Sequence, residues 1–225
     1  MKVSNKSSKV NRAWLNDHVN DTYVKLAKKE GYRARAAYKL QEIDETFRLI
    51  KPGDLVIDLG SAPGAWSQYA RRRMSPKTAT GGGAAVGALN GRIIALDILP
   101  MDPVEGVLFL QGDFREEEVL QRLTLELQGT KADVVVSDMA PNLSGLPAVD
   151  SARIEHLVEL ALDFCQHHLK PQGALVVKVF HGSGYDQWVK LFKAHFKQVK
   201  PIKPKASRDK SSETFLVGLG LITPP

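Results

Sequence analysis

Short apolar runs alternate with helical patterns along most of this chain, and that alternation limits its fold more than any other feature. The runs are rich in Val, Ile and Leu and occupy residues 55–59, 92–97, 107–110, 133–138, 174–180 and 214–221. They lack strict polar alternation, which is typical of strands covered on both faces of a parallel sheet. Helical spacing marks residues 21–47, 151–169 and 185–196. We therefore predict a doubly wound α/β domain.

One domain is the expected organisation, because 225 residues of which 43% are hydrophobic suffice for one sizeable core. We expect residues 21–225 to form it and the polar residues 1–20 to be a mobile basic arm. Residues 74–91 contain a run of three glycines, which predicts a flexible, disordered loop. The only cysteine, Cys165, excludes an internal disulfide and a cysteine-rich metal site, and no metal is expected.

The chain shows no apolar run long enough to cross a bilayer and no apolar block behind its N-terminal charges. These features predict a soluble, cytoplasmic protein, which we expect to be a monomer without a membrane partner. The net charge of +6 is unevenly spread. Lys and Arg outnumber Asp and Glu by 12 to 6 in residues 1–51 and by 8 to 1 in residues 190–210. Such basic segments are typical of nucleic-acid binding, although they also occur as solvated helix faces.

A glycine-containing loop follows the first predicted strand and precedes a helix. Gly60 and Gly64 allow the backbone to turn sharply and approach a ligand closely. A tight turn without a ligand is the alternative, because this spacing alone is not specific. The dinucleotide fingerprint G-x-G-x-x-G is absent, which favours a nucleoside without a pyrophosphate and disfavours a nicotinamide-dependent oxidoreductase.

Acidic residues stand at the ends of the next three predicted strands, where ligands of open α/β sheets bind. Asp97 suits the paired hydroxyls of a ribose, Asp113 suits an exocyclic adenine amine, and Asp138 ends the fourth run. A helix N-cap would explain one such residue but hardly all of them. Lys178 is unusual in another way, because it interrupts an apolar strand. Lysine is seldom buried without a partner, so it has a function there unless it faces a hydrated sheet edge.

Several motifs together give a resemblance across nearly the whole chain. They are residues 58–67 (DLGSAPGAWS), 99–102 (LPMD), 111–114 (QGDF), 137–142 (SDMAPN), 147–150 (PAVD) and 177–180 (VKVF). The chain resembles the FtsJ/RrmJ-type RNA 2′-O-ribose methyltransferases, and among them those that act on 23S ribosomal RNA. The resemblance implies a Rossmann-like, mostly parallel seven-stranded sheet with helices on both faces. It also implies S-adenosylmethionine as cofactor and a uridine of 23S rRNA, in the large ribosomal subunit or its precursor, as substrate.

The resemblance places site residues by motif position. The implied catalytic tetrad is Lys39, Asp138, Lys178 and Glu213. The implied cofactor contacts are Gly60, Pro63, Gly64, Trp66, Asp97, Asp113 and Asp138. This chain departs from the family in having Ala65 before the tryptophan, where a second glycine is usual, and in a longer loop around Gly82.

Methyl transfer to a hydroxyl needs alignment and a group that takes the hydroxyl proton. Lys178 serves as that base only if it is neutral part of the time. Burial, Lys39 and a sulfonium favour the neutral amine, whereas Asp138 and Glu213 oppose it. Basic residues near both ends of the chain are expected to hold RNA: Lys28, Lys29, Arg33, Arg35, Lys203, Lys205, Arg208 and Lys210. Methylation of a transfer RNA or messenger cap, and a non-catalytic assembly factor, remain the alternatives.

Overall fold

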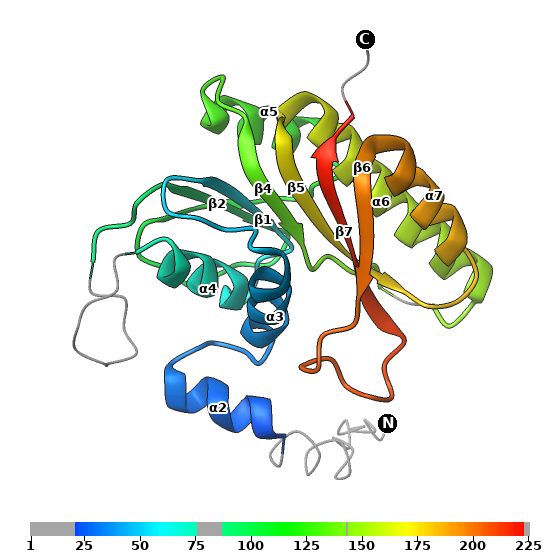
Figure 1. The fold of residues 1–225 in the computed structure, drawn as a ribbon, viewed down its shortest axis with the longest axis horizontal. Coiled ribbons are helices and arrows are strands. Elements are labelled where there is room, and N and C mark those ends of the chain that lie inside the picture. The colour runs from blue at the N-terminus through cyan, green and yellow to red at the C-terminus, as the bar shows by residue number, and fades with distance from the viewer. Residues whose placement is uncertain (1–20, 76–86, 143, 223–225) are drawn as a thin grey trace, which may run out of the picture.

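The computed structural model describes residues 21–75, 87–142 and 144–222. Within them, one seven-stranded sheet has the order β3-β2-β1-β4-β5-β7-β6 (Figure 1). The strands are β1 (Leu55–Leu59), β2 (Arg92–Asp97), β3 (Val107–Gln111), β4 (Ala132–Ser137), β5 (Leu169–Phe180), β6 (Phe196–Ile202) and β7 (Glu213–Leu221). Strands β1 to β5 pair in parallel, and β7 is antiparallel to both β5 and β6. The predicted mostly parallel, doubly wound sheet is confirmed.

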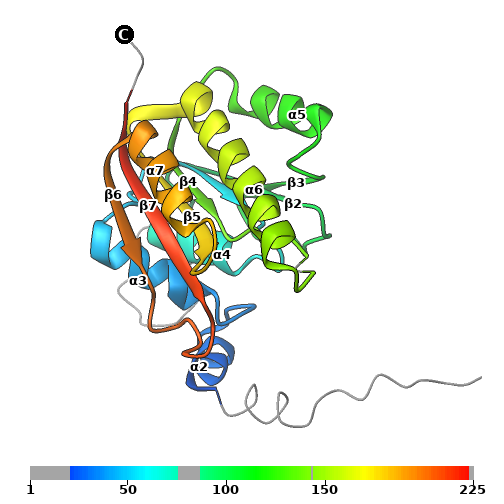
Figure 2. The same cartoon turned by 90° about the vertical axis from the view of Figure 1, so that its right-hand side faces the viewer.

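Helices cover both faces of this sheet. They are α2 (Thr22–Glu30), α3 (Ala37–Phe47), α4 (Ala65–Arg73), α5 (Glu117–Leu127), α6 (Pro147–His168) and α7 (Tyr185–His195). Helices α3 and α4 pack in one hydrophobic core, and α5, α6 and α7 pack in another on the opposite face (Figure 2). Helix α2 lies beyond the end of α3, beside the segment that joins β6 to β7 (Figure 1).

The alternation of side chains along β1 assigns residues to these two cores. Leu55, Ile57 and Leu59 belong to the core of α5, α6 and α7, whereas Val56 belongs to that of α3 and α4. Successive strand residues point to opposite faces, so Asp58 shares the face of Val56. The carboxyl end of β1 therefore presents the buried Asp58 toward α3 and α4.

The single helical span predicted over residues 21–47 is wrong, because two helices occupy it. Asp21 caps α2 by accepting a 2.9 Å hydrogen bond from the Tyr23 N–H. The helix ends at Gly31, whose φ of 73° lies in the left-handed region that favours glycine. Helix α3 then begins at Ala37, six residues after that turn.

Other boundaries also differ from the prediction. Helix α6 begins at Pro147 rather than at residue 151, and proline suits a first helical turn because its missing N–H is not needed there. Strand β5 begins at Leu169, and its pairing with β4 shifts register before Ala174. Strand β6 and helix α5 were not predicted individually.

Two predicted flexible segments fall largely outside the described residues, namely the arm at 1–20 and positions 76–86 of the loop at 74–91. The described ends of that loop are held in place. Met74 is fully buried, and Arg71 donates a 3.1 Å hydrogen bond to the carbonyl of Gly87. In the part of the chain that the structure describes, no helix is long and apolar enough to span a membrane.

Candidate active site

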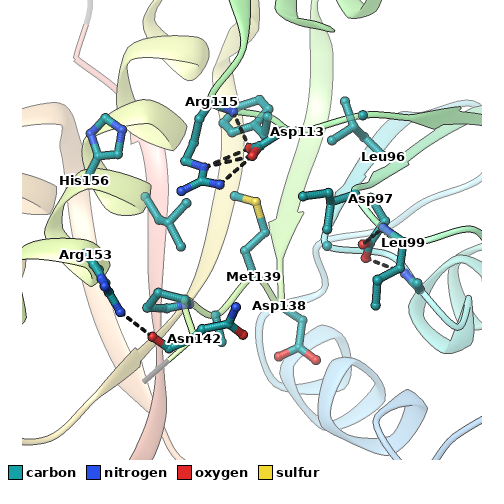
Figure 3. A pocket seen from close by; sticks show the side chains of 18 residues that line it. Leu96, Asp97, Leu99, Asp113, Arg115, Asp138, Met139, Asn142, Arg153 and His156 are labelled. Carbon is teal, nitrogen blue, oxygen red and sulfur yellow. Dashed lines mark hydrogen bonds and ion pairs between the residues drawn. The ribbon is translucent and has the colours of Figure 1, made fainter. Parts of the chain in front are cut away.

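A cavity of about 720 Å³ opens at the carboxyl edge of the sheet (Figure 3). It lies beside the neighbouring strands β1 and β4, after which the chain continues to opposite sides of the sheet, to β2 and to β5. Ligands of open α/β sheets bind at this switch in strand order. The residues that line it come from the ends of β1, β2, β3 and β4 and from α6. They are Gly60, Ala62, Leu96, Asp97, Ile98, Leu99, Gly112, Asp113, Phe114, Arg115, Asp138, Met139, Ala140, Pro141, Asn142, Arg153, His156 and Leu157.

Asp97 ends β2 and joins the two loops that border the cavity. Its Oδ2 accepts a 2.8 Å hydrogen bond from the Ala62 N–H, and its Oδ1 accepts one of 2.8 Å from the Leu99 N–H. Because each carboxylate oxygen can accept more than one hydrogen bond, both keep capacity for ligand hydroxyls. Asp97 is thus placed as expected for a residue that binds a ribose.

Asp113 also lines the cavity, but a neighbouring cation already contacts it. Arg115 Nε and Nη2 donate hydrogen bonds of 2.9 Å and 2.5 Å to its two carboxylate oxygens (Figure 3). These bonds from Arg115 outweigh partial burial and hold the pKa of Asp113 below its usual range. The sequence did not indicate Arg115, because an arginine two residues after an acid is common on protein surfaces.

Lys178 and Asp138 form the first pair of the implied tetrad. Lys178 Nζ donates a 2.6 Å hydrogen bond to the backbone carbonyl of Asp138 and lies 3.0 Å from its Oδ1. Both side chains are largely buried, at 10% and 21% exposure. The amine therefore does not face a hydrated sheet edge. Oδ1 of Asp138 is itself buried, and its contact among the described residues is this ion pair with Lys178.

Lys39 and Glu213 form the second pair. Lys39 Nζ lies 2.6 Å from Oε1 and 2.8 Å from Oε2 of Glu213, and Ser207 Oγ donates a 2.8 Å hydrogen bond to Oε1. Burial favours the neutral acid, but Lys39, the Ser207 hydroxyl and Lys178 together outweigh it and lower the pKa of Glu213. The carboxylate consequently stays ionised at neutral pH.

Strand register brings the two pairs together. Lys178 lies directly opposite Phe215 in the β5–β7 ladder, and Glu213 is two residues away on the same face. Lys39 reaches this face from α3, with its Nζ 5.8 Å from the centre of the Phe215 ring. The structure thus gathers all four tetrad residues on the α3 side of the sheet, at the edge where the cavity opens.

Three of the implied cofactor residues do not line the cavity. Trp66 is buried in α4, where its Nε1 donates a 2.8 Å hydrogen bond to the Ala36 carbonyl and its ring packs against Phe215. Pro63 follows a cis peptide bond, and Gly64 precedes α4 with a φ of 107°. These residues shape the loop that bears Gly60 and Ala62, both of which face the cavity.

The basic residues expected to hold RNA fall into two groups. Lys28, Lys29, Lys203, Lys205, Arg208 and Lys210 are exposed. Arg35 instead pairs with Asp21 and donates to the Ala206 carbonyl, and Arg33 donates to backbone carbonyls of other loops. The bond from Arg35 holds α2 and the β6–β7 segment together, so the two basic regions lie side by side next to Lys39 and Glu213.

Asp58 is a buried residue of this region that motif analysis did not single out as functional. Its Oδ2 accepts a 2.6 Å hydrogen bond from Ser67 Oγ, while Oδ1 has no partner among the described residues. Complete burial, reinforced by the charges of Asp138 and Asp97, outweighs the Ser67 hydrogen bond and raises the pKa of Asp58 to about 7. Its position as the first residue of the glycine loop was the only available signal.

Comparison with known proteins identifies the family. A family model described as FtsJ-like methyltransferase matches residues 32–221. The chain belongs to the FtsJ-like methyltransferase family. A relative from Albidiferax ferrireducens is 78% identical over 98% of this chain and 99% of its own length, and one from Paracidovorax citrulli is 73% identical over the same shares. Both are named ribosomal RNA large subunit methyltransferase E.

Solved structures agree with this family. A Plasmodium falciparum protein assigned as a ribosomal RNA methyltransferase is 28% identical to this FtsJ-like methyltransferase, with a TM-score of 0.72. That similarity covers 86% of this chain and all of the other. Aeropyrum pernix fibrillarin, solved with bound S-adenosyl-L-methionine, is 15% identical with a TM-score of 0.55 over 82% of this chain and 73% of its own, and shows the fold alone.

Proposed function

We propose that this methyltransferase transfers a methyl group from S-adenosylmethionine to a ribose 2′-hydroxyl of large-subunit ribosomal RNA, at a uridine of the 23S molecule. The placement of Lys178 carries the proposal, because a largely buried amine stands beside Asp138 at the rim of a nucleoside-sized cavity. The names of the relatives support the RNA. A ribosomal substrate also supports action in the cytoplasm, and we keep the expectation of a monomer.

The cavity fits the cofactor. Its volume lies within the range of small-molecule sites, roughly 300–1,000 Å³. A Cβ on Gly60 would come within 2.8 Å of Met139, so this backbone approaches the β4 loop as only glycine allows. Asp97 and Asp113 would hold the ribose and the adenine, and Asp138 lines the same cavity. The bound cofactor supplies an electrophilic methyl group on a sulfonium.

The tetrad would then serve the acceptor hydroxyl. Lys178 Nζ would take the 2′-hydroxyl proton, which leaves the ribose oxygen able to accept the methyl group that the cofactor would supply. Asp138 orients the amine through its carbonyl and its carboxylate. Lys39 and Glu213 position the ribose from the adjacent strand and helix. A positioned base typically contributes about 10²–10⁴-fold in rate.

The adjoining basic regions support RNA as the polymer that enters this site. Exposed lysines of α2, and exposed lysines and Arg208 of the β6–β7 segment, flank Lys39 and Glu213. Cations that contact phosphates position a nucleic acid without reading its sequence. The choice of nucleotide therefore rests on RNA shape or on the ribosomal particle.

The deciding experiment incubates the full chain and labelled S-adenosylmethionine with substrates that lack the modification. These are large subunits, small subunits, transfer RNA and capped messenger RNA. We expect label on a uridine of the large subunit, and resistance of the next phosphodiester to alkali because the 2′-oxygen is blocked. Label found only on transfer RNA or on a messenger cap would show that this RNA, and not large-subunit ribosomal RNA, is the substrate. Cofactor binding without transfer to any RNA would favour an assembly factor.

A further inference from the structure

Arg33 lies between α2 and α3, and its guanidinium bonds to two loops distant in sequence. Nη1 donates hydrogen bonds of 2.9 Å to the Pro63 carbonyl and 2.6 Å to the Asp102 carbonyl. Nη2 donates one of 2.7 Å to the Pro103 carbonyl. One cation thus bridges the loop after β1 and the loop after β2.

Both of these loops border the cofactor cavity. The loop after β1 contributes Gly60 and Ala62 to its lining, and the loop after β2 contributes Ile98 and Leu99. Their spacing therefore sets the width of the cavity mouth between β1 and β2.

The two loops are also joined by a group of opposite charge. Asp97 accepts hydrogen bonds from the N–H groups of Ala62 and Leu99, whereas Arg33 donates to carbonyls of the same two loops. Hydrogen bonds to charged groups are stronger than neutral ones, so the pair fixes the loops more firmly than backbone contacts would. Asp97 is part of the cavity lining, whereas Arg33 joins the same two loops from outside the cavity.

The site of Arg33 is built for a planar, forked donor. A Cβ on Gly64 would come within 2.7 Å of Arg33 Nη1 and 3.0 Å of the Met101 sulfur, so the glycine leaves room for the guanidinium. The Arg33 N–H also donates a 2.8 Å hydrogen bond to Gln68 of α4. A lysine keeps the charge but offers one ammonium in place of two separated nitrogens.

We propose that Arg33 is a positioning residue of the cofactor pocket, which holds the β1 and β2 loops at the separation that the cofactor requires. This inference rests on the proposed function, because it takes the cavity as the cofactor site. Arg33 was expected to contact RNA, and the proposal assigns its guanidinium to contacts within the protein instead. Arg33 acts through Gly60, Ala62 and Leu99 rather than on the reacting atoms.

The test measures S-adenosylhomocysteine binding to the full chain by calorimetry, for wild type, Arg33→Lys, Arg33→Gln and the exposed control Lys28→Gln. We expect Arg33→Gln to weaken binding about tenfold or more, and Arg33→Lys by about threefold or more, because charged hydrogen bonds are lost. Lys28→Gln should stay within about twofold of wild type, since it removes only an exposed charge. In turnover, Arg33→Lys should raise KM for the cofactor and leave kcat nearly unchanged at saturation.

RNA binding over a salt series separates the two roles of a cation. Arg33→Lys should keep the wild-type salt dependence, whereas Lys28→Gln should flatten it. Wild-type cofactor affinity in Arg33→Lys would overturn the inference, and this variant keeps the test decisive if Arg33→Gln does not fold. If the wild-type chain itself binds no S-adenosylhomocysteine, the proposed function fails instead.

Discussion

Lys178 Nζ donates a 2.6 Å hydrogen bond to the Asp138 carbonyl while it lies 3.0 Å from the carboxylate of the same residue. One residue of β4's end thus fixes the amine through its main chain and its side chain. The charge of Lys178 also helps to lower the pKa of Glu213, which links this contact to the second pair.

Replacement of Lys178 by arginine separates proton transfer from charge. Arginine stays protonated and cannot take the hydroxyl proton. We expect Lys178→Arg and Lys178→Met to lose about 10²-fold or more in single-turnover rate. Both should still bind S-adenosylhomocysteine in calorimetry. Near-normal transfer by a folded Lys178→Arg would show that the residue only orients the ribose.

Lys39 and Glu213 should behave as one unit. Each contacts the other at 2.6–2.8 Å, so removal of either partner leaves the second charge buried without its counterion. We expect Lys39→Met and Glu213→Gln each to lower kcat/KM by about tenfold or more. The kcat/KM of the double variant should be no lower than that of the less active single variant. A rate assay of the four proteins gives the coupling. Multiplied losses in the double variant would mean that the residues act independently.

Ser207→Ala is the matched control for that cycle. It removes only the hydroxyl that donates to Glu213 Oε1 and leaves Lys39 in place. Its loss should be smaller than that of either charged partner, because one hydrogen bond from a neutral donor is removed while the Lys39–Glu213 ion pair remains.

Asp58 should make folding stability depend on pH. The unfolded chain ionises this carboxyl near its ordinary pKa of 3.8, whereas the folded protein keeps the proton up to a pKa of about 7. The folded state then binds more protons between these values, so its stability falls as pH rises through that window, by at most about 4 kcal/mol.

Asp58→Asn removes this titration. We expect denaturant unfolding from pH 4 to pH 8 to show a shallower decline for Asp58→Asn than for wild type. Ser67→Ala should extend the decline to higher pH, because the Ser67 hydrogen bond lowers the pKa of Asp58. Parallel curves for wild type and Asp58→Asn would contradict the assigned protonation.

The basic surface should govern affinity for RNA without affecting the chemistry. The double substitution Lys28→Glu and Lys29→Glu should weaken RNA binding and reduce its salt dependence by roughly one unit of slope per lost phosphate contact. Lys131→Glu is the control, because this exposed residue precedes β4 at the opposite edge of the sheet. RNA affinity is measured by filter binding at several salt concentrations. Equal losses of affinity in the Lys28→Glu/Lys29→Glu variant and in Lys131→Glu would refute the proposed RNA surface on α2.

Cys165 should be inert in the folded protein. Its side chain is fully buried in α6, and burial raises the pKa of its thiol. Thiol reagents react with the exposed thiolate. We expect no labelling under native conditions and one label per chain in denaturant, as read by mass spectrometry. Rapid native labelling would show that α6 opens easily.

The parallel strands could be predicted closely because their apolar runs have sharp ends. β1 and β2 occupy the predicted residues. Both strands are buried on two faces, so their sequences are mostly apolar and lack a polar alternation. β6 was not predicted, because Lys197, Lys200 and Pro201 interrupt its apolar pattern. It is an edge strand, and its only pairing among the described residues is with β7. Local sequence carries no signal for such a contact.

The candidate site could be predicted only in part. The strand patterns placed Asp138 at the end of one apolar run and Lys178 inside another, but only the family resemblance grouped the two. Lys39 and Glu213 are 174 positions apart, and only the family resemblance paired them. The role of Arg33 was not predictable, because its partners are backbone carbonyls, which every residue possesses.

The reversed direction of β7 has a consequence for how the enzyme is divided. A strand that ran with its neighbours would begin at the far edge and carry Glu213 away from the cavity. Under the proposed function, the half of the sheet from β3 to β4 would hold the methyl donor, while β5 and β7 would supply Lys178 and Glu213 for the acceptor. Substitutions in β5 and β7 could therefore adapt the enzyme to a different RNA without changes in the strands from β3 to β4.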